Sequence, residues 1–152
     1  MVLTDPAFEA LLADQSKRID GDIEWINDED HSYCRIFSAE ILSDPGYALS
    51  AKGTYNPIAG ALSFALIYAG HGRIYALDLG KDHRNPGGEK VGEKHKHRWT
   101  ERYRDKQAYV PPDITASPGE VVLAWAQFCA EAKIRHDGKM SPPKAAQDSL
   151  FV

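Results

Sequence analysis

Two histidines separated by one residue, His95 and His97, occur in a segment whose pattern is typical of a β-strand. Alternate side chains of a strand point to the same face, so both imidazoles share one side while Lys96 and Arg98 line the other. Their side chains are roughly 7 Å apart at the base, which lets two imidazoles converge on one divalent ion or one phosphate group. The segment is therefore a candidate for metal or phosphate chemistry.

A third histidine, His83, lies in the loop that precedes this predicted strand. The turn signal over residues 85–88 would bring it toward His95 and His97 if the loop folds back. Three neutral imidazoles with an open position form a catalytic zinc-type site or a site for a softer transition metal. The metal hypothesis thus names His83, His95 and His97 as ligands of one divalent transition metal ion.

Glu101 follows on the histidine face of the same predicted strand, about 13 Å from His97 in a regular strand. At this distance it is expected to orient a ligand or to act as a general base rather than to bind the metal itself. The H-x-H-x-x-x-E spacing resembles the first metal motif of cupin barrels. The second cupin motif is missing downstream, so a cupin-like metal-binding protein is one alternative among several.

A metal-free hypothesis assigns His95, His97 and Glu101 to acid–base catalysis on an RNA phosphodiester. Basic side chains beside them would hold the phosphate and stabilise its developing charge. These phosphate-binding candidates are Lys96, Arg98, Arg102 and Arg104. Trp99 and Tyr103 could stack bases. A third interpretation is structural only, with lysines that protect a sheet edge and histidines that are surface polar groups.

Apolar residues alternate with polar ones through most of the chain, a pattern typical of half-buried β-strands. We therefore expect a β-sheet to position these residues. Strands are predicted over residues 23–26, 33–42, 47–55, 61–68, 73–79, 95–101 and 107–110. A helix is expected from Asp5 to about Lys17–Arg18. Another is expected after the capping box at Ser117, ending near residues 134–136 with Gly138 as the C-terminal stop. The predicted fold class is α+β, an antiparallel meander of about six or seven strands with an N-terminal and a C-terminal helix packed on one face.

The length of 152 residues and the ordinary composition favour one domain over residues 1–138, followed by a C-terminal tail over 139–152. Cys34 and Cys129 lie in apolar runs and are expected to be buried free thiols, as in a reducing compartment. No signal peptide is expected, because residues 1–5 lack a basic region followed by an apolar stretch. The longest apolar segment, residues 59–69, is shorter than the ~20 residues that cross a membrane. We therefore expect a soluble, cytoplasmic protein with no membrane partner.

Charge is distributed unevenly along the chain. The formal net charge is −4, yet nine of the 18 basic residues and three of the six histidines fall within residues 81–106. The first 80 residues instead contain twelve acidic and five basic residues. This asymmetry concerns the binding partners of the protein rather than its fold.

Three motifs together resemble the signature of an uncharacterised family of small bacterial and phage domains. H-x-N-P-x-G begins at His83, H-x-H begins at His95, and E-x-Y-x-D-K-x-A begins at Glu101. The resemblance covers roughly residues 60–135 and implies that the motif histidines, Glu101 and Asp105 matter, without implying an established activity. Members of the family are small proteins of mobile elements, and their H-x-H strand is similar to one in toxin components of toxin–antitoxin modules.

Three functional hypotheses follow. The leading one is a toxin-module or phage-associated protein that acts on RNA or another phosphate-bearing ligand, as a ribonuclease-like phosphodiesterase would. The second is a non-enzymatic, phage-encoded inhibitor of a host defence complex, such as an anti-CRISPR protein, that binds through acidic residues: Asp20, Asp22, Glu24, Asp28, Glu29 and Asp30. The third is the cupin-like metal protein. A shared ligand sphere requires the imidazoles of His83, His95 and His97 to lie within about 5 Å of one another.

Overall fold

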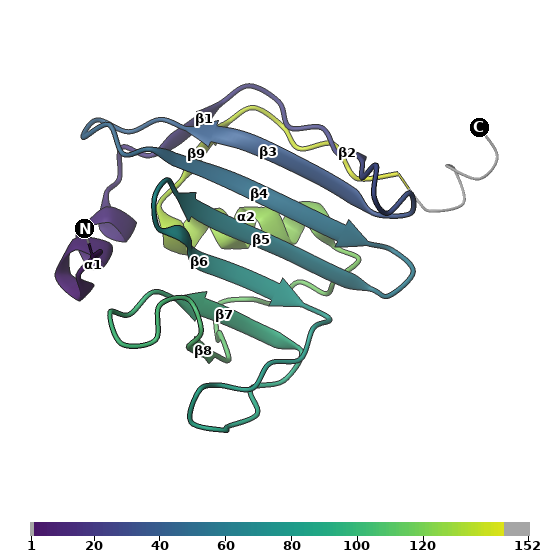
Figure 1. The fold of residues 1–152 in the computed structure, drawn as a ribbon. Coiled ribbons are helices and arrows are strands. Elements are labelled where there is room, and N and C mark those ends of the chain that lie inside the picture. The colour runs from purple at the N-terminus through teal and green to yellow at the C-terminus, as the bar shows by residue number, and fades with distance from the viewer. Residues whose placement is uncertain (1, 145–152) are drawn as a thin grey trace.

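The computed structural model describes residues 2–144 and is built around a seven-stranded antiparallel sheet (Figure 1). Each strand pairs with its neighbours along the chain, in the order β2-β3-β4-β5-β6-β7-β8. The strands are β2 (Ile26–Asn27), β3 (Arg35–Ile41), β4 (Leu49–Asn56), β5 (Ala61–Tyr68), β6 (Gly72–Leu79), β7 (Lys94–Arg98) and β8 (Ala108–Tyr109). The α+β meander predicted from the alternation of apolar residues is confirmed.

The C-terminal helix α2 (Val121–Ala132) covers one face of this sheet (Figure 1). Its buried aromatic rings pack on those of the central strands. Phe128 stacks on Tyr75 with 5.2 Å between ring centroids, and Trp125 lies at the same distance from Phe64. Burial of large aromatic side chains is a main source of core stability. Within the described chain no helix covers the opposite face, which we call the open face, so polar side chains can gather on it.

The N-terminal helix α1 (Asp5–Ala13) lies at one end of the sheet and is shorter than the sequence predicts (Figure 1). The helix was expected to reach Lys17, but that residue folds back instead and its side chain is buried. Its Nζ donates hydrogen bonds to three carbonyls at the helix end, those of Leu11, Leu12 and Asp14, at 2.7, 2.9 and 2.6 Å. Satisfying these free carbonyls ends the helix early.

A second, two-stranded sheet brings the two ends of the domain together. β1 (Arg18–Asp20) pairs in parallel with β9 (Arg135–Asp137), a contact between distant segments that alternation did not predict. Met140 is buried and pairs with Ile23, so the first residues of the predicted tail contact the body of the domain. Residues 145–152 of that tail lie outside the described residues.

The end of α2 also differs from the prediction. Lys133 ends the helix in the left-handed conformation, with φ 55°, whereas Gly138 was expected to stop it. Gly138 instead lies directly against the backbone of Gly21, where any side chain would collide. Among the described residues, no helix is long and apolar enough to cross a membrane.

The predicted strand over residues 95–101 is cut short at the end of β7. Thr100 leaves the ladder and pairs with Arg104 across a tight turn, with N···O distances of 3.0 and 2.7 Å. Arg104 has φ 57°, a left-handed conformation that few residues other than glycine adopt. The turn removes Glu101 from the strand face that His95 and His97 share.

Candidate metal centre

Asp78 and the two strand histidines lie together on the open face because of strand alternation and register. Tyr75 of β6 packs against α2. Ala76 and Asp78 have the opposite parity along the strand, so their side chains point away from α2 toward the open face. The β6–β7 ladder places Asp78 opposite His95 and Ala76 opposite His97. Residues that face each other across a ladder project from the same side of the sheet. One carboxylate and two imidazoles therefore meet on the open face.

The carboxylate of Asp78 joins three side chains. Its Oδ2 lies 3.0 Å from His95 Nε2 and 3.2 Å from His97 Nε2. Its Oδ1 accepts a hydrogen bond from the Ser63 hydroxyl at 2.6 Å. Burial alone would raise the pKa of Asp78, but hydrogen bonds from His95, His97 and Ser63 outweigh burial and hold that pKa far below its ordinary value. Asp78 is thus ionised at physiological pH.

Backbone carbonyls hold the outer nitrogens of both strand histidines. His95 Nδ1 donates to Gly92 O and His97 Nδ1 donates to Asp105 O, each at 2.8 Å. A carbonyl oxygen only accepts, so each Nδ1 carries a proton and each Nε2 is left to face Asp78. Each Nε2 either carries a second proton, which it donates to Asp78, or is an unprotonated nitrogen that can bind a metal.

The charge of His95 depends on what occupies the site. Burial lowers the pKa of His95, but the hydrogen bonds to Asp78 and to the Gly92 carbonyl raise it, and the net shift is upward. In the metal-free protein the contacts with Asp78 and the Gly92 carbonyl therefore favour the protonated ring. A metal ion that binds Nε2 must displace that proton, so metal binding would strengthen with rising pH.

His83 reaches the site because its loop is anchored to β8. The Asn85 side chain donates to Ala108 O at 2.9 Å and accepts from Ala108 N–H at 2.8 Å, which ties the loop to that strand. The His83 Nε2 lies 2.8 Å from Lys106 O. Since that carbonyl must accept, Nε2 carries the proton and Nδ1 keeps a free lone pair.

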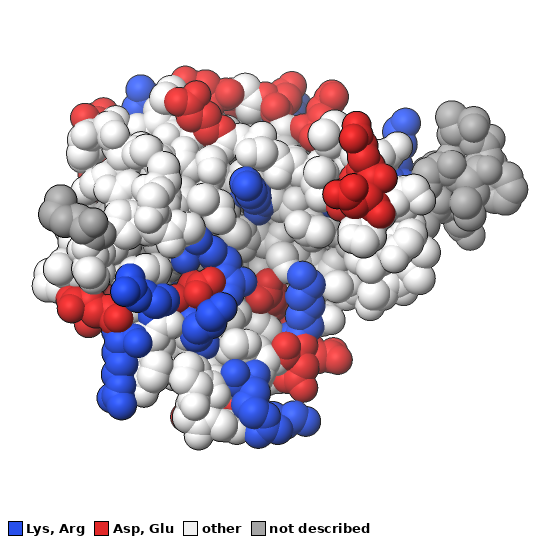
Figure 2. Space-filling view, in the orientation of Figure 1, with Lys and Arg blue, Asp and Glu red and all other residues white. Residues whose placement is uncertain are grey.

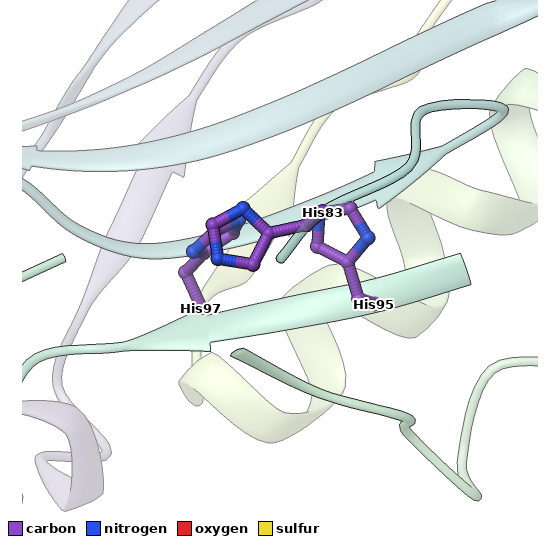
Figure 3. Close-up of side chains that lie close together, drawn as sticks. All are labelled: His83, His95 and His97. Carbon is purple, nitrogen blue, oxygen red and sulfur yellow. The ribbon is translucent and has the colours of Figure 1, made fainter. Parts of the chain in front are cut away.

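The structure brings the three histidines into one cluster, on the same side of β7 (Figure 3). Ring centroids lie 4.6 Å apart for His83 and His97, 5.4 Å for His83 and His95, and 4.9 Å for His95 and His97. One nitrogen from each ring lies within 4.8 Å of the others. This is the spacing that the metal hypothesis required.

Two of the four predicted phosphate-binding residues lie on the other face of β7. Lys96 is buried, and its Nζ binds Asp113 Oδ2 at 2.6 Å and Glu131 Oε1 at 3.0 Å. Arg98 binds the carboxylate of Glu9 on α1 at 2.8 Å. Both residues alternate with the histidines, so the pleat of the strand turns them toward the helices. The structure does not place them at the histidine site.

The remaining predicted residues lie in the turn after β7 and do not reach the cluster either. Glu101 accepts from the Asp5 backbone N–H at 2.9 Å, and Asp5 Oδ1 accepts from the Glu101 N–H at 2.8 Å, so the pair ties the turn to the start of α1. Arg102 lies over the ring of Tyr103, and Arg104 lies over that of Trp99. These residues hold the turn and α1 together.

Several residues at the site were missed by the sequence analysis. Asp78, Ser63 and Arg73 line an open pocket of about 380 Å³ with the three histidines, Lys81 and Lys106. Arg73 Nε donates to Asp105 Oδ2 at 3.0 Å, which braces the residue whose carbonyl holds His97. One signal was available: Asp78 is a lone carboxylate between two leucines in a mostly apolar strand, and buried charges need partners.

A family model described as "Family of unknown function (DUF6978)" matches residues 3–134. The chain belongs to this family. The matched DUF6978 region includes both helices, the seven-stranded sheet and all the histidines of the cluster. Membership agrees with the expected relation to an uncharacterised domain family, and it carries no link to phage or to toxin–antitoxin modules. No curated protein and no solved structure matches the chain.

Replacing Lys96 by methionine should separate its structural role in this DUF6978 chain from the predicted phosphate-binding role. The substitution K96M leaves Asp113 and Glu131 without their shared cation, so the free energy of unfolding should fall by about 2–3 kcal/mol. Chemical denaturation measures this loss, with exposed Lys52 changed to methionine as the control. Unchanged stability together with weaker ligand binding would instead place Lys96 at the binding site.

Proposed function

We propose that the protein binds one divalent transition metal ion, with Zn²⁺ as the first candidate, and uses it for hydrolysis. The ligands would be Nε2 of His95, Nε2 of His97 and Oδ2 of Asp78. His83 completes the set through Nδ1, because its Nε2 is engaged with Lys106 O. Nitrogen and carboxylate ligands of this kind suit zinc and the neighbouring first-row metals.

The observation that carries this proposal is the double anchoring of each strand histidine. His95 and His97 each fix Nδ1 on a backbone carbonyl and direct Nε2 at the same oxygen of Asp78. Metal-binding histidines nearly always donate the other ring N–H in this way, which fixes the tautomer and the ring orientation. The Ser63 hydroxyl fixes the orientation of Asp78 in a comparable way, by donating a hydrogen bond to Oδ1 of the carboxylate.

The distances between the ligand atoms are compatible with a shared metal. Bonds of about 2.0–2.1 Å to a tetrahedral ion place neighbouring ligand atoms ~3.3 Å apart. Asp78 Oδ2 lies 3.0 and 3.2 Å from the two Nε2 atoms, distances at which they hydrogen-bond without a metal and could share one ion. The ligand nitrogens of the three histidines lie within 4.8 Å of one another.

Metal-assisted hydrolysis is the reaction class that this arrangement favours. The pocket is open on the side away from the sheet, so water could enter as a fifth ligand of the bound ion. A zinc ion lowers the pKa of bound water to about 7, which supplies a hydroxide nucleophile at neutral pH. An RNA substrate, as expected for a toxin-like phosphodiesterase, belongs to this class.

The geometry supports metal-free acid–base catalysis less well. His95 and His97 are only 1% and 2% exposed, and each has both nitrogens engaged by fixed protein oxygens. A general acid or base must come within hydrogen-bond reach of the substrate proton. Neither ring can do so without breaking its bond to Asp78, and Glu101 lies outside the pocket.

A metal titration of chain that was purified without a histidine tag and depleted of metal tests the proposal. Calorimetry and native mass spectrometry should show one Zn²⁺ per chain, with a Kd of about 1 µM or tighter. The substitution H97A should weaken binding strongly, whereas H31A, which removes an exposed histidine outside the cluster, should not. Failure to bind zinc, cobalt, nickel or manganese, or equal binding by the two variants, would refute the metal centre.

A further inference from the structure

Three cationic side chains from separate segments line the pocket of the proposed metal centre. They are Arg73 of β6, Lys81 of the loop after β6, and Lys106 of the turn before β8. Lys81 and Lys106 are exposed. Figure 2 shows the open face, with Lys and Arg gathered mostly over the β6–β8 half and Asp and Glu mostly along the β1–β3 side. An anion approaching the open face is therefore drawn toward the histidine pocket.

The carboxylates near the pocket balance only part of this positive charge. Arg73 pairs with Asp105 at 3.0 Å and lies 3.9 Å from Asp78, which also binds the histidines and Ser63. Lys81 and Lys106 therefore carry most of the charge that a ligand can use. Asp82 accepts from the His83 backbone N–H and lies 3.8 Å from Lys90. Lys106 Nζ lies 3.7 Å from Asp105, but the lysine side chain is 69% exposed, and such surface pairs are weak.

We infer that the open position of the metal centre takes the phosphate group of a phosphate ester, with Arg73, Lys81 and Lys106 offsetting its charge. This inference rests on the proposed metal centre. A divalent ion added to the pocket leaves surplus positive charge that faces solvent, and an anionic oxygen ligand would balance it. A neutral substrate would leave the three cations without a function in binding.

The shape of the pocket suits a phosphate carried on a larger molecule. It opens on the face that no described helix covers, next to Ser63 of β5 and its ladder partner Thr54 of β4, with Lys52 of β4 opposite the pocket residue Ala65. Groups on either side of the phosphate can therefore extend over the sheet. A diester in a nucleic-acid backbone and a monoester in a nucleotide share this recognition chemistry, and the experiment must separate them.

The test uses the whole chain loaded with Co²⁺, whose visible absorption changes when an oxygen ligand enters its coordination sphere. Dimethyl phosphate, methyl phosphate and a short single-stranded RNA are titrated separately. We expect a saturable spectral change with at least one of them. The double substitution K81Q/K106Q should weaken this binding about tenfold while leaving Co²⁺ affinity within about twofold. The matched double substitution K139Q/K144Q removes two exposed lysines that do not line the pocket and should change neither.

The outcomes separate the two claims. A response to dimethyl phosphate and RNA identifies a diester substrate, and a response to methyl phosphate alone identifies a monoester, so both support the inference. A chain that binds Co²⁺ but responds to none of the three probes overturns the phosphate inference and leaves the metal centre intact. Equal phosphate binding by K81Q/K106Q and wild type also overturns it. A chain that binds no metal overturns the metal centre and the inference together.

Discussion

Replacing Asp78 with asparagine should lower the affinity of the chain for Zn²⁺ by about 100-fold or more, because the anionic ligand between the two Nε2 atoms is lost. Asparagine keeps the size of the side chain and an oxygen that can accept from Ser63. The loss would therefore report the charge of Asp78 rather than a cavity. Competition with a chromophoric chelator measures the affinity.

The same substitution should change the pH dependence of stability in the metal-free protein. The raised pKa of His95 contributes stability that is present below about pH 6.5, the ordinary histidine pKa, and is lost as pH rises through the folded value. The lowered pKa of Asp78 contributes stability above about pH 3.9 that is lost as pH falls. The pair is therefore most stabilising between these limits, and D78N should be less stable there by about 3 kcal/mol.

A second carboxylate of the pocket provides the matched control for D78N. Asp82 also lines the pocket, but it is exposed. It accepts the backbone N–H of His83 through Oδ1, which asparagine can replace, and its other contact is a weak surface pair with Lys90 at 3.8 Å. D82N should keep both the zinc affinity and the pH profile of the wild type. Equal losses in D78N and D82N would mean that general pocket charge, and not ligation by Asp78, controls binding.

Replacing Gly80 with alanine should unfold part of the site and lower the free energy of unfolding by about 3 kcal/mol or more. Gly80 has φ +79°, and a Cβ there would collide with the backbone carbonyl oxygen of Gly60. Its N–H also donates to Glu93 O at 3.0 Å, which closes the base of the loop that carries His83. A shifted loop base would move His83 away from the other histidines, so zinc affinity should fall as well.

Gly88 lies in the same loop and is the control for Gly80. It also has a positive φ, +96°, but a Cβ added there would meet nothing within 4 Å. G88A should therefore cost only the strain of the left-handed backbone, about 1–2 kcal/mol, and should keep zinc binding. Thermal and chemical denaturation compare the two variants. If G80A is no less stable than G88A, the close packing of the loop base on Gly60 is not what positions His83.

The large sheet was predictable because its information is local. Each strand pairs with the next one along the chain, so alternation and turn signals between neighbours, such as those around residues 44–46, were sufficient. The β1–β9 pair joins segments at opposite ends of the domain and has no local signal. The early end of α1 depends on the buried ammonium of Lys17, a tertiary contact that a helical pattern does not reveal.

At the site, alternation placed His95 and His97 on one face, and the turn signal at 85–88 correctly suggested a loop that brings His83 to them. The same alternation places Lys96 on the opposite face of the strand. Its predicted phosphate role at the histidine face was therefore inconsistent with that alternation. The sequence marks Asp78 as an unusual buried charge but does not show that it pairs with His95. Its position opposite His95 depends on the register between β6 and β7, which a long intervening loop leaves undetermined.

The centre of this account is a metal ion held by histidines and one carboxylate on the open face of the sheet. X-ray absorption spectroscopy of the zinc-loaded chain tests it most directly, because it reports the ligand atoms themselves. We predict four or five nitrogen or oxygen ligands at about 2.0–2.2 Å with the scattering pattern of at least two imidazoles, reduced in H97A. A spectrum with no imidazole scattering, or one that H97A leaves unchanged, would contradict the account.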